Sequence, residues 1–466
     1  MVEISIERRD ALARTPAHDV ALDCLASGIA AAHPETLVAE ALSVDGSVLT
    51  VRPVAGAGAD GSPVEYDLDA FDDVVLLGGG NAAGTLASAL ESTLGTRLSG
   101  GVVVTDNPSE TARIDVLRGD HPLPSERGIA GTRRLLDRAD AAGADDLVIT
   151  AITGGASALL AAPVSSLSLF DLRATTRELL ASGATIDEIN AVRKHCSAIK
   201  GGQLARMAAP ATVVTLAVSD VVGDDRSVIG SGPTVPDPST YADALAVLDR
   251  YDLDVPDSVR EHLQAGAAGG RPETPTAADP AFDRTNTHVI GSGRTALAAA
   301  RETAAEHGYT PMALASGVRG EARESALTHV AIAEECRDAG APVSPPAVLL
   351  SGGETTVTLG DDPGSGGPNQ EFATSGAVAL ADAGDGAGDG SAVVVASVDT
   401  DGIDGSTDAA GAVVDGATLS AAAGRDALDR NDTYAALSDA GAIVRTGPTG
   451  TNVNDLRVLV VEPSSR

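Results

Sequence analysis

Residues 73–91 read DVVLLGGGNAAGTLASALE. The apolar run Asp73–Leu77 is followed by three glycines and then by a segment in which apolar residues recur at helical spacing. This order predicts a buried strand, a tight turn at Gly78, Gly79 and Gly80, and a helix, which is the opening unit of a doubly wound sheet. Near-continuous apolar runs typical of parallel strands covered on both faces continue at Val102–Thr105, Leu147–Thr153, Val213–Ser219 and Val289–Gly291.

From Pro345 onward the pattern changes to apolar runs joined by loops rich in Gly and Asp, which predicts a second, smaller α/β domain. We expect an N-terminal domain over residues 1–285, a connecting segment over 286–344 and a C-terminal domain over 345–466. Within the first domain, the stretch Gln264–Asn286 is rich in Pro, Ala and Gly and predicts a surface excursion or a linker. In the second, the segments predicted as strands are AVLLSGG, TTVTLG, AVVVASV and AIVRTG, and ADAGDGAGDGS is predicted to be a solvated loop.

The chain carries 66 acidic and 32 basic residues among 466, a formal charge of −34. Such a field repels nucleic acid and anionic lipid, so neither is expected as a partner. The acidic residues are spread along the chain, which favours adaptation to a high-salt cytosol; a merely acidic mesophilic protein is the alternative. Three scattered cysteines argue against a disulfide framework or a zinc site. Without an apolar run of about 18 residues, we expect a soluble, cytoplasmic protein.

Only two of the 32 cationic residues are lysines, Lys194 and Lys200, and both lie in VRKHCSAIKGG. All other cationic residues of the chain are arginines. The presence of both lysines in one short segment therefore indicates that a compact ammonium group is required there, as in phosphate binding. The alternative for Lys194 is a structural pair with a nearby acid. The glycines before Asn81 allow backbone N–H groups to approach an anion, although a structural turn explains them equally well.

The stretch SDVVGDDRSVIGSGPT, residues 219–234, follows a predicted strand. Asp220 and Asp224 come where doubly wound sheets place their ligands, and carboxylates there suit Mg²⁺. Ser231, Gly232 and Thr234 form a candidate anion nest. The alternative is an ordinary capped turn, because Asp and Gly are common turn residues.

In the second domain, Asp399, Asp401 and Asp404 follow a predicted strand in SVDTDGIDGST. No glutamate closes this loop as in a calcium-binding EF-hand. We expect Asp399 and Asp401 to contribute to the nucleotide- or substrate-binding site, and the alternative is a solvated acidic loop without a binding role. Other amide and carboxylate side chains suited to binding hydroxyl groups are Glu354, Asn369, Gln370, Glu371, Asn452, Asn454 and Asp455. We do not assign either His121 or His195 as a catalytic base.

Taken together, the chain resembles the glycerate 2-kinase family with its C-terminal MOFRL domain. The matching segments run in family order across nearly the whole chain: GDHPLPSERG, ITGGASALL, INAVRKHCSAIKGGQLA, VVTLAVSDVVGDDRSVIGSGPTVPDPSTY, SGGETTVTLG, GGPNQEF, SVDTDGIDGSTDAAGA and GPTGTNVNDL. The resemblance implies a Rossmann-like N-terminal domain, an active site in a cleft between the domains, Mg·ATP as donor and D-glycerate as acceptor.

From these residues we expect catalytic roles for Lys194, Lys200, Asp220 and Asn81, and Mg²⁺ binding at Asp220 and Asp224. The resemblance gives a catalytic role to a lysine whose place Asn81 takes in this chain. It adds Gly154, Gly155 and Ser157 of ITGGASALL to the nucleotide- or substrate-binding residues. Two positions depart from the family pattern, Asn81 where a lysine is usual and Pro368 where many relatives have a basic residue. A hydroxypyruvate reductase and a non-catalytic glycerate- or nucleotide-binding protein are the alternatives. The oligomeric state stays open, with a homodimer among the options.

Overall fold

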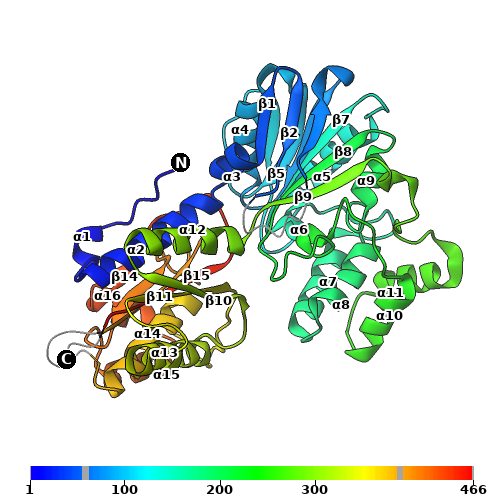
Figure 1. The fold of residues 1–466 in the computed structure, drawn as a ribbon. Helices are drawn as coiled ribbons and strands as arrows, with labels where there is room; N and C mark the ends of the chain where they lie inside the picture. Colours follow the sequence, from blue (N-terminus) through cyan, green and yellow to red (C-terminus); the bar gives the residue numbers. More distant parts are fainter. Residues whose placement is uncertain (1, 55–61, 386–391, 464–466) are drawn as a thin grey trace. The chain divides into compact units, whose positions relative to one another are not determined.

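The computed structural model describes residues 2–54, 62–385 and 392–463 (Figure 1). They form two compact units, one built from the chain up to Thr36 and from Gly291 onward, the other from Leu37 to Ile290. We call these the discontinuous unit and the central unit. Among the described residues, no helix combines the length and the apolar character needed to cross a lipid bilayer.

The central unit contains a sheet in the order β6-β5-β4-β7-β8-β9, and the strand pairs from β6 through β8 are parallel. Every residue of β4 and β7 is buried, as expected for a parallel sheet covered on both faces. This confirms the predicted α/β class. The strands are β4 (Val74–Gly79), β5 (Gly100–Thr105), β6 (Ile114–Arg118), β7 (Leu147–Ile152), β8 (Thr212–Val218) and β9 (Thr285–Gly291).

The helices of the central unit begin at sequence-encoded caps. Ser168, Thr185 and Thr240 each form a capping box with the acidic residue three positions later, which satisfies N–H groups that the first turn leaves unbonded. The helices are α4 (Ala83–Leu94), α5 (Glu126–Asp140), α6 (Ala156–Leu159), α7 (Leu169–Ala181), α8 (Ile186–His195), α9 (Gln203–Ala208), α10 (Tyr241–Arg250) and α11 (Asp257–Ala265). Apolar side chains of α7, α8, α10 and α11 form a core of their own.

A separate antiparallel sheet consists of β1 (Leu42–Asp45), β2 (Val48–Val51) and β3 (Val64–Asp67). The stretch Gln264–Asn286, expected to be a surface excursion or a linker, is anchored to the central unit. Thr274 Oγ1 donates a hydrogen bond of 2.9 Å to the buried Asp237 carboxylate.

The discontinuous unit contains a mixed sheet in the order β10-β11-β15-β12-β13-β14, in which only β10 and β11 pair in parallel. Helices α13 and α14 bury apolar residues against one face, and α2 and α12 lie on the other (Figure 1). The strands are β10 (Thr310–Val318), β11 (Ala347–Gly353), β12 (Val393–Asp399), β13 (Gly411–Asp415), β14 (Ile443–Val444) and β15 (Asp455–Val461). The helices are α1 (Arg9–Leu12), α2 (Pro16–Ala32), α12 (Gly293–Glu306), α13 (Ala322–Ala339), α14 (Pro368–Asp382), α15 (Ala421–Asp429) and α16 (Thr433–Asp439), while α3 (Pro34–Ala41) crosses the boundary between the units.

This division differs from the predicted domains 1–285 and 345–466. Helix α2 lies so close to α12 and β15 that a side-chain carbon at Gly28 would be 2.5 Å from Leu456 Cδ2 and 3.0 Å from the Ala296 carbonyl oxygen. Residues 286–344, expected to be a connecting segment, contribute α12, β10 and α13 to the packed unit. The sequence pattern does not reveal this division into units, because the contacts that form the discontinuous unit join segments far apart in the chain.

Two predicted strands are wrong or shortened. In TTVTLG only Thr356 forms a bridge, to Glu321, and in AIVRTG only Ile443–Val444 is a strand. Most of ADAGDGAGDGS, from residue 386 to 391, lies outside the described residues.

Candidate functional site

Five polar or glycine positions lie just beyond the carboxyl ends of neighbouring strands in the central unit. Such ends are where open parallel sheets bind their ligands. The residues follow β4, β5, β6, β7 and β8 in turn and are Asn81, Asp106, His121, Gly154 and Asp220.

The turn Gly154–Gly155 brings several of these side chains together. A methyl group at Gly155 would lie 1.7 Å from Asn81 Oδ1 and 3.2 Å from the His121 ring, and one at Gly154 would lie 2.3 Å from Asp220 Oδ2. Gly155 also has a φ of 75°, in the left-handed region that glycine adopts without strain. Both positions therefore require glycine, because the polar groups occupy the space that a side chain would need.

Asn81 is held against an acid that sequence reasoning missed. Its Nδ2 donates a hydrogen bond of 2.8 Å to Asp106 Oδ2, and its carbonyl oxygen accepts one of 3.1 Å from Thr105 Oγ1. Asp106 Oδ1 is buried and has no hydrogen-bond partner within the described parts of the chain. The available signal was the position of Asp106, which follows the predicted strand Val102–Thr105 as Asp220 follows Val213–Ser219.

The first glycine turn uses its own N–H groups inside the fold. The N–H of Gly80 donates to Val104 O (3.1 Å), that of Asn81 to Gly154 O (2.8 Å), and that of Ala82 to Thr153 Oγ1 (3.2 Å). Gly78 and Gly79 belong to β4 itself. These contacts join the ends of β4, β5 and β7, so the structural-turn alternative explains the glycines better than an anion cradle does.

Lys200 is buried near the same edge of the sheet. Its ammonium group donates a hydrogen bond of 3.0 Å to Leu160 O, and Leu160 packs against Gly79. Burial, and to a smaller degree the charge of the neighbouring Arg193, lower the pKa of Lys200 to about 7. Lys200 is thus a cation that loses its proton easily unless an anion binds beside it.

The loop around Ser231 connects Lys200 to helix α6. The N–H of Gly201 donates to Ser231 O (3.0 Å), and that of Gly202 to Gly232 O (2.7 Å). Ser231 Oγ lies 2.7 Å from Ser157 Oγ and donates a hydrogen bond of 2.9 Å to Asn190 Oδ1. Of the remaining predicted residues here, Thr234 contacts Thr215 inside the unit at 2.7 Å.

Lys194 occupies a different environment from Lys200. Its ammonium group pairs with Asp237 at 3.2 Å, and both side chains are buried. Asp237 also accepts hydrogen bonds from Ser239 and Thr274. The structure therefore shows the pairing with a nearby acid that was the structural alternative for this lysine.

Asp220 is an acid with an altered proton affinity. Burial raises its pKa to about 6, because desolvation disfavours the carboxylate. Asp224 has a left-handed backbone with a φ of 58° in the loop that follows. Within the described residues, no three His, Cys, Asp or Glu side chains converge to hold a metal ion.

A second polar cluster lies in the discontinuous unit, at the ends of β12 and β15. Asp404 accepts hydrogen bonds from the N–H groups of Asn369 (3.0 Å) and Gln370 (2.9 Å), and so caps the start of α14. Burial raises the pKa of Asp404 to about 6. The pKa of Asp399 is also raised, first by burial and then by the charges of Asp401 and Asp455.

Internal partners hold most of the predicted residues of this unit. Asp455 accepts a hydrogen bond of 2.7 Å from Asn369 Nδ2 and forms an ion pair with the fully buried Arg457. Glu371 is buried and pairs with Arg323 at 3.0 Å. Of the other three predicted residues, Glu354 is exposed and its N–H donates to Val318 O at 2.9 Å. Asn452 accepts a hydrogen bond of 3.0 Å from the N–H of Asn454, whose carbonyl oxygen accepts one of 2.8 Å from Thr400 Oγ1.

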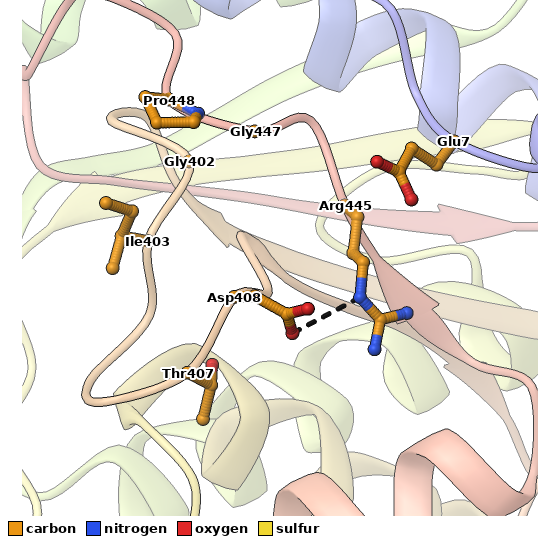
Figure 2. A pocket seen from close by; sticks show the side chains of 8 residues that line it. All are labelled: Glu7, Gly402, Ile403, Thr407, Asp408, Arg445, Gly447 and Pro448. Carbon is orange, nitrogen blue, oxygen red and sulfur yellow. Dashed lines mark ion pairs between the residues drawn. The ribbon is translucent and has the colours of Figure 1, made fainter.

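Figure 2 shows a pocket of about 450 Å³ that is lined in part by residues of the 402–408 loop. Arg445 and Asp408 pair across it at 3.2 Å. None of the predicted site residues lines it; the lining residues are Glu7, Gly402, Ile403, Thr407, Asp408, Arg445, Gly447 and Pro448.

The sheet with polar residues at its carboxyl edge defines an α/β protein of the ligand-binding, doubly wound class. Residues 20–264 match a family described as a domain of unknown function, DUF4147, and residues 347–455 match the MOFRL family. The glycerate 2-kinase of Pyrococcus horikoshii is 38% identical over 95% of this chain and 97% of its own. The crystal structure of a Thermotoga maritima glycerate kinase is similar with a TM-score of 0.79 and 35% identity, covering 95% of this chain and 98% of that one. The chain belongs to the glycerate kinase family.

A further relative carries a different name. A protein of Agrobacterium vitis, provisionally named hydroxypyruvate reductase, is 44% identical over 83% of this chain and 87% of its own.

Proposed function

We propose that this protein is a glycerate 2-kinase that transfers the γ-phosphoryl group of ATP to the 2-hydroxyl of D-glycerate, giving 2-phosphoglycerate. Membership of the glycerate kinase family supports the reaction class. The observation that carries the proposal is the group of polar residues at the carboxyl edge of the central sheet, with Asp220 beside Gly154 and Asn81 beside Gly155.

In this proposal Asp220 accepts the proton of the reacting hydroxyl. A pKa of about 6 leaves the carboxylate mostly ionised at neutral pH while keeping it basic enough to take a proton. Lys200 neutralises phosphate charge, since an anion near its ammonium group offsets the desolvation that now lowers its pKa. Ser157 lies beside Ser231 of the Lys200 loop and would offer its hydroxyl group to the same ligand.

The donor groups of this edge fit a magnesium nucleotide. Mg²⁺ is held by one or two carboxylates together with phosphate oxygens, and Asp224 would supply a carboxylate, while Asp220 is kept in this proposal as the proton acceptor. A bound Mg²⁺ neutralises charge on the phosphates during transfer.

Lys194 has a structural role in this proposal, because its charge is already paired with Asp237. The assignments of Asp399, Asp401 and the 452–455 loop to substrate binding stay predictions, as does a homodimer. We further propose that the protein works in a cytoplasm of high salt concentration, where salt screens the repulsion between its acidic residues. The even spread of these residues along the chain supports this proposal.

The test is phosphoryl transfer in vitro. Purified protein, ATP, Mg²⁺ and D-glycerate are incubated at increasing KCl up to molar concentration, and phosphorus NMR identifies the product. We expect 2-phosphoglycerate and a rate that rises with KCl. Absence of any phosphorylated glycerate from protein whose circular dichroism shows that it is folded would refute the kinase proposal; a rate independent of KCl would refute only the salt adaptation.

The Agrobacterium vitis relative keeps hydroxypyruvate reduction as a second candidate. A dinucleotide needs N–H groups at the first glycine turn, but those of Gly80, Asn81 and Ala82 are already donated inside the fold. Oxidation of NADH or NADPH by hydroxypyruvate, measured with the same preparation, separates the two activities. Glycerate binding by calorimetry without turnover would instead favour a non-catalytic binding protein.

A further inference from the structure

Within the described parts of the chain, one carboxylate oxygen of Asp106 has no hydrogen-bond donor. Oδ2 is fixed by the Asn81 amide at 2.8 Å, whereas Oδ1 is buried without a partner among the described residues. A buried, unpaired carboxylate oxygen is costly, and native proteins retain such groups mainly where a ligand or water completes them.

The position of Asp106 associates it with the proposed catalytic edge. Asn81 connects it to the Gly154–Gly155 turn, because Asn81 Oδ1 occupies the space of a Gly155 side chain. Asp220 Oδ2 fills the corresponding space at Gly154. The two acids thus approach the same pair of glycines, Asp220 directly and Asp106 through the amide of Asn81.

The chemistry of the oxygen limits what it can bind. An ionised carboxylate accepts hydrogen bonds only, and it repels the carboxylate and phosphate groups of the substrates. Within a glycerate molecule, only the two hydroxyl groups can donate to it. If Asp220 takes the proton of the reacting 2-hydroxyl, the 3-hydroxyl is the donor left for Asp106.

We propose that Asp106, oriented by Asn81, is a specificity-determining residue that accepts a hydrogen bond from the 3-hydroxyl of glycerate. This assignment rests on the proposed function. In this assignment Asn81 orients the Asp106 carboxylate through a hydrogen bond to Oδ2. Because the Asn81 amide is neutral, the negative charge of Asp106 stays available to the substrate hydroxyl. The assignment also implies selection for 2,3-dihydroxy acids over 2-hydroxy acids that lack the second hydroxyl.

The test compares D-glycerate with D-lactate, which has the same carboxylate and 2-hydroxyl but no 3-hydroxyl. We expect wild-type kcat/KM to favour glycerate by at least about 10²-fold, because a site built to bond a hydroxyl rejects the analogue without it. In Asp106→Ala the efficiency with glycerate should fall about 10²-fold while that with lactate changes less than about threefold. The isosteric Asp106→Asn variant guards against loss of folding and should also lose most of the preference.

A matched control is Asp115→Ala, which removes an exposed carboxylate from β6 of the same sheet and should leave the substrate ratio unchanged. Equal losses with both substrates in the Asp106 variants would indicate a structural or general-base role and overturn the assignment. The assignment would also be overturned if the wild-type enzyme used D-glycerate and D-lactate with equal efficiency, which is the result expected if Asp106 Oδ1 binds only a water molecule.

Calorimetry separates this inference from the proposed function. D-glycerate should bind to wild type more tightly than D-lactate, and Asp106→Ala should remove the difference. Binding selectivity without turnover would reject the kinase and retain the hydroxyl assignment. Equal binding of the two acids to wild type would reject the assignment whether or not glycerate is phosphorylated.

Discussion

Replacing Gly155 by alanine tests how tightly the catalytic edge is packed. The added methyl group would lie 1.7 Å from Asn81 Oδ1, far inside van der Waals contact, and the amide would have to move. Moving it breaks the 2.8 Å hydrogen bond to Asp106. A hydrogen bond to a charged group contributes about 1.5–3 kcal/mol, so this term alone should lower the free energy of unfolding by that amount.

Backbone strain must be separated from this clash, and Gly183 provides the control. Its φ of 74° matches the 75° of Gly155, but apart from its chain neighbours no described residue has an atom within 4 Å of a methyl group placed there. Both substitutions place alanine in the left-handed region, at a cost of about 1–2 kcal/mol. Gly183→Ala should show that cost only and keep full kinase activity.

Urea denaturation followed by circular dichroism measures both variants, and kcat/KM for D-glycerate is determined in parallel. We expect Gly155→Ala to be less stable than Gly183→Ala by about 1.5–3 kcal/mol. Its activity should fall about 10²-fold or more, because small displacements of positioned groups have large effects on rate. Equal stability of the two variants, with Gly155→Ala fully active, would refute the packing described here.

The two lysines should respond differently to replacement by methionine. Because the pKa of Lys200 is about 7 in the folded protein and higher when unfolded, the unfolded chain binds more protons above pH 7. Between pH 7 and 10 this group should therefore raise the free energy of unfolding of the wild type by up to about 1.4 kcal/mol per pH unit, and Lys200→Met should lack this rise. Urea denaturation measures the free energy of unfolding of both proteins against pH, and curves that run parallel for the two would contradict the lowered pKa of Lys200. Lys194→Met leaves Asp237 buried without its cation and should lower the free energy of unfolding by about 3–5 kcal/mol. The double variant Lys194→Met with Asp237→Asn should regain much of that stability. If thermal denaturation shows no such recovery, the broken ion pair is not the cause of the loss.

The strands that the sequence revealed are those buried on both faces. Runs such as Val74–Leu77 and Val393–Val398 contain no polar residue except small ones, so their pattern predicts strands without any knowledge of their neighbours. Strand β6 lies at a sheet edge with only Ile114 buried, and β15 contains Asp455 and Arg457. Their polar residues are satisfied by tertiary partners, which local patterns do not record.

The candidate site was predictable to a similar degree. Glycine turns and the acid after β8 follow from the rule that ligands bind at the carboxyl ends of parallel strands. The same rule applies to Asp106, but the orientation of its carboxylate depends on Asn81, 25 residues earlier in the chain. Likewise, the sequence does not distinguish Lys194 from Lys200, whereas their partners in the fold do: the buried Asp237 carboxylate for Lys194 and the Leu160 carbonyl oxygen for Lys200.

The discontinuity of one unit has a consequence for synthesis on the ribosome. Helix α2 emerges early, whereas its partners α12 and β15 come much later; Thr451 Oγ1 reaches back 419 residues to bond Ala32 O at 2.6 Å. The nascent chain therefore carries an unmatched apolar helix through most of translation, while the central unit has all of its residues once Ile290 has emerged. The central unit can fold first, and the discontinuous unit can complete its own sheet only after β15, its last strand, has been made.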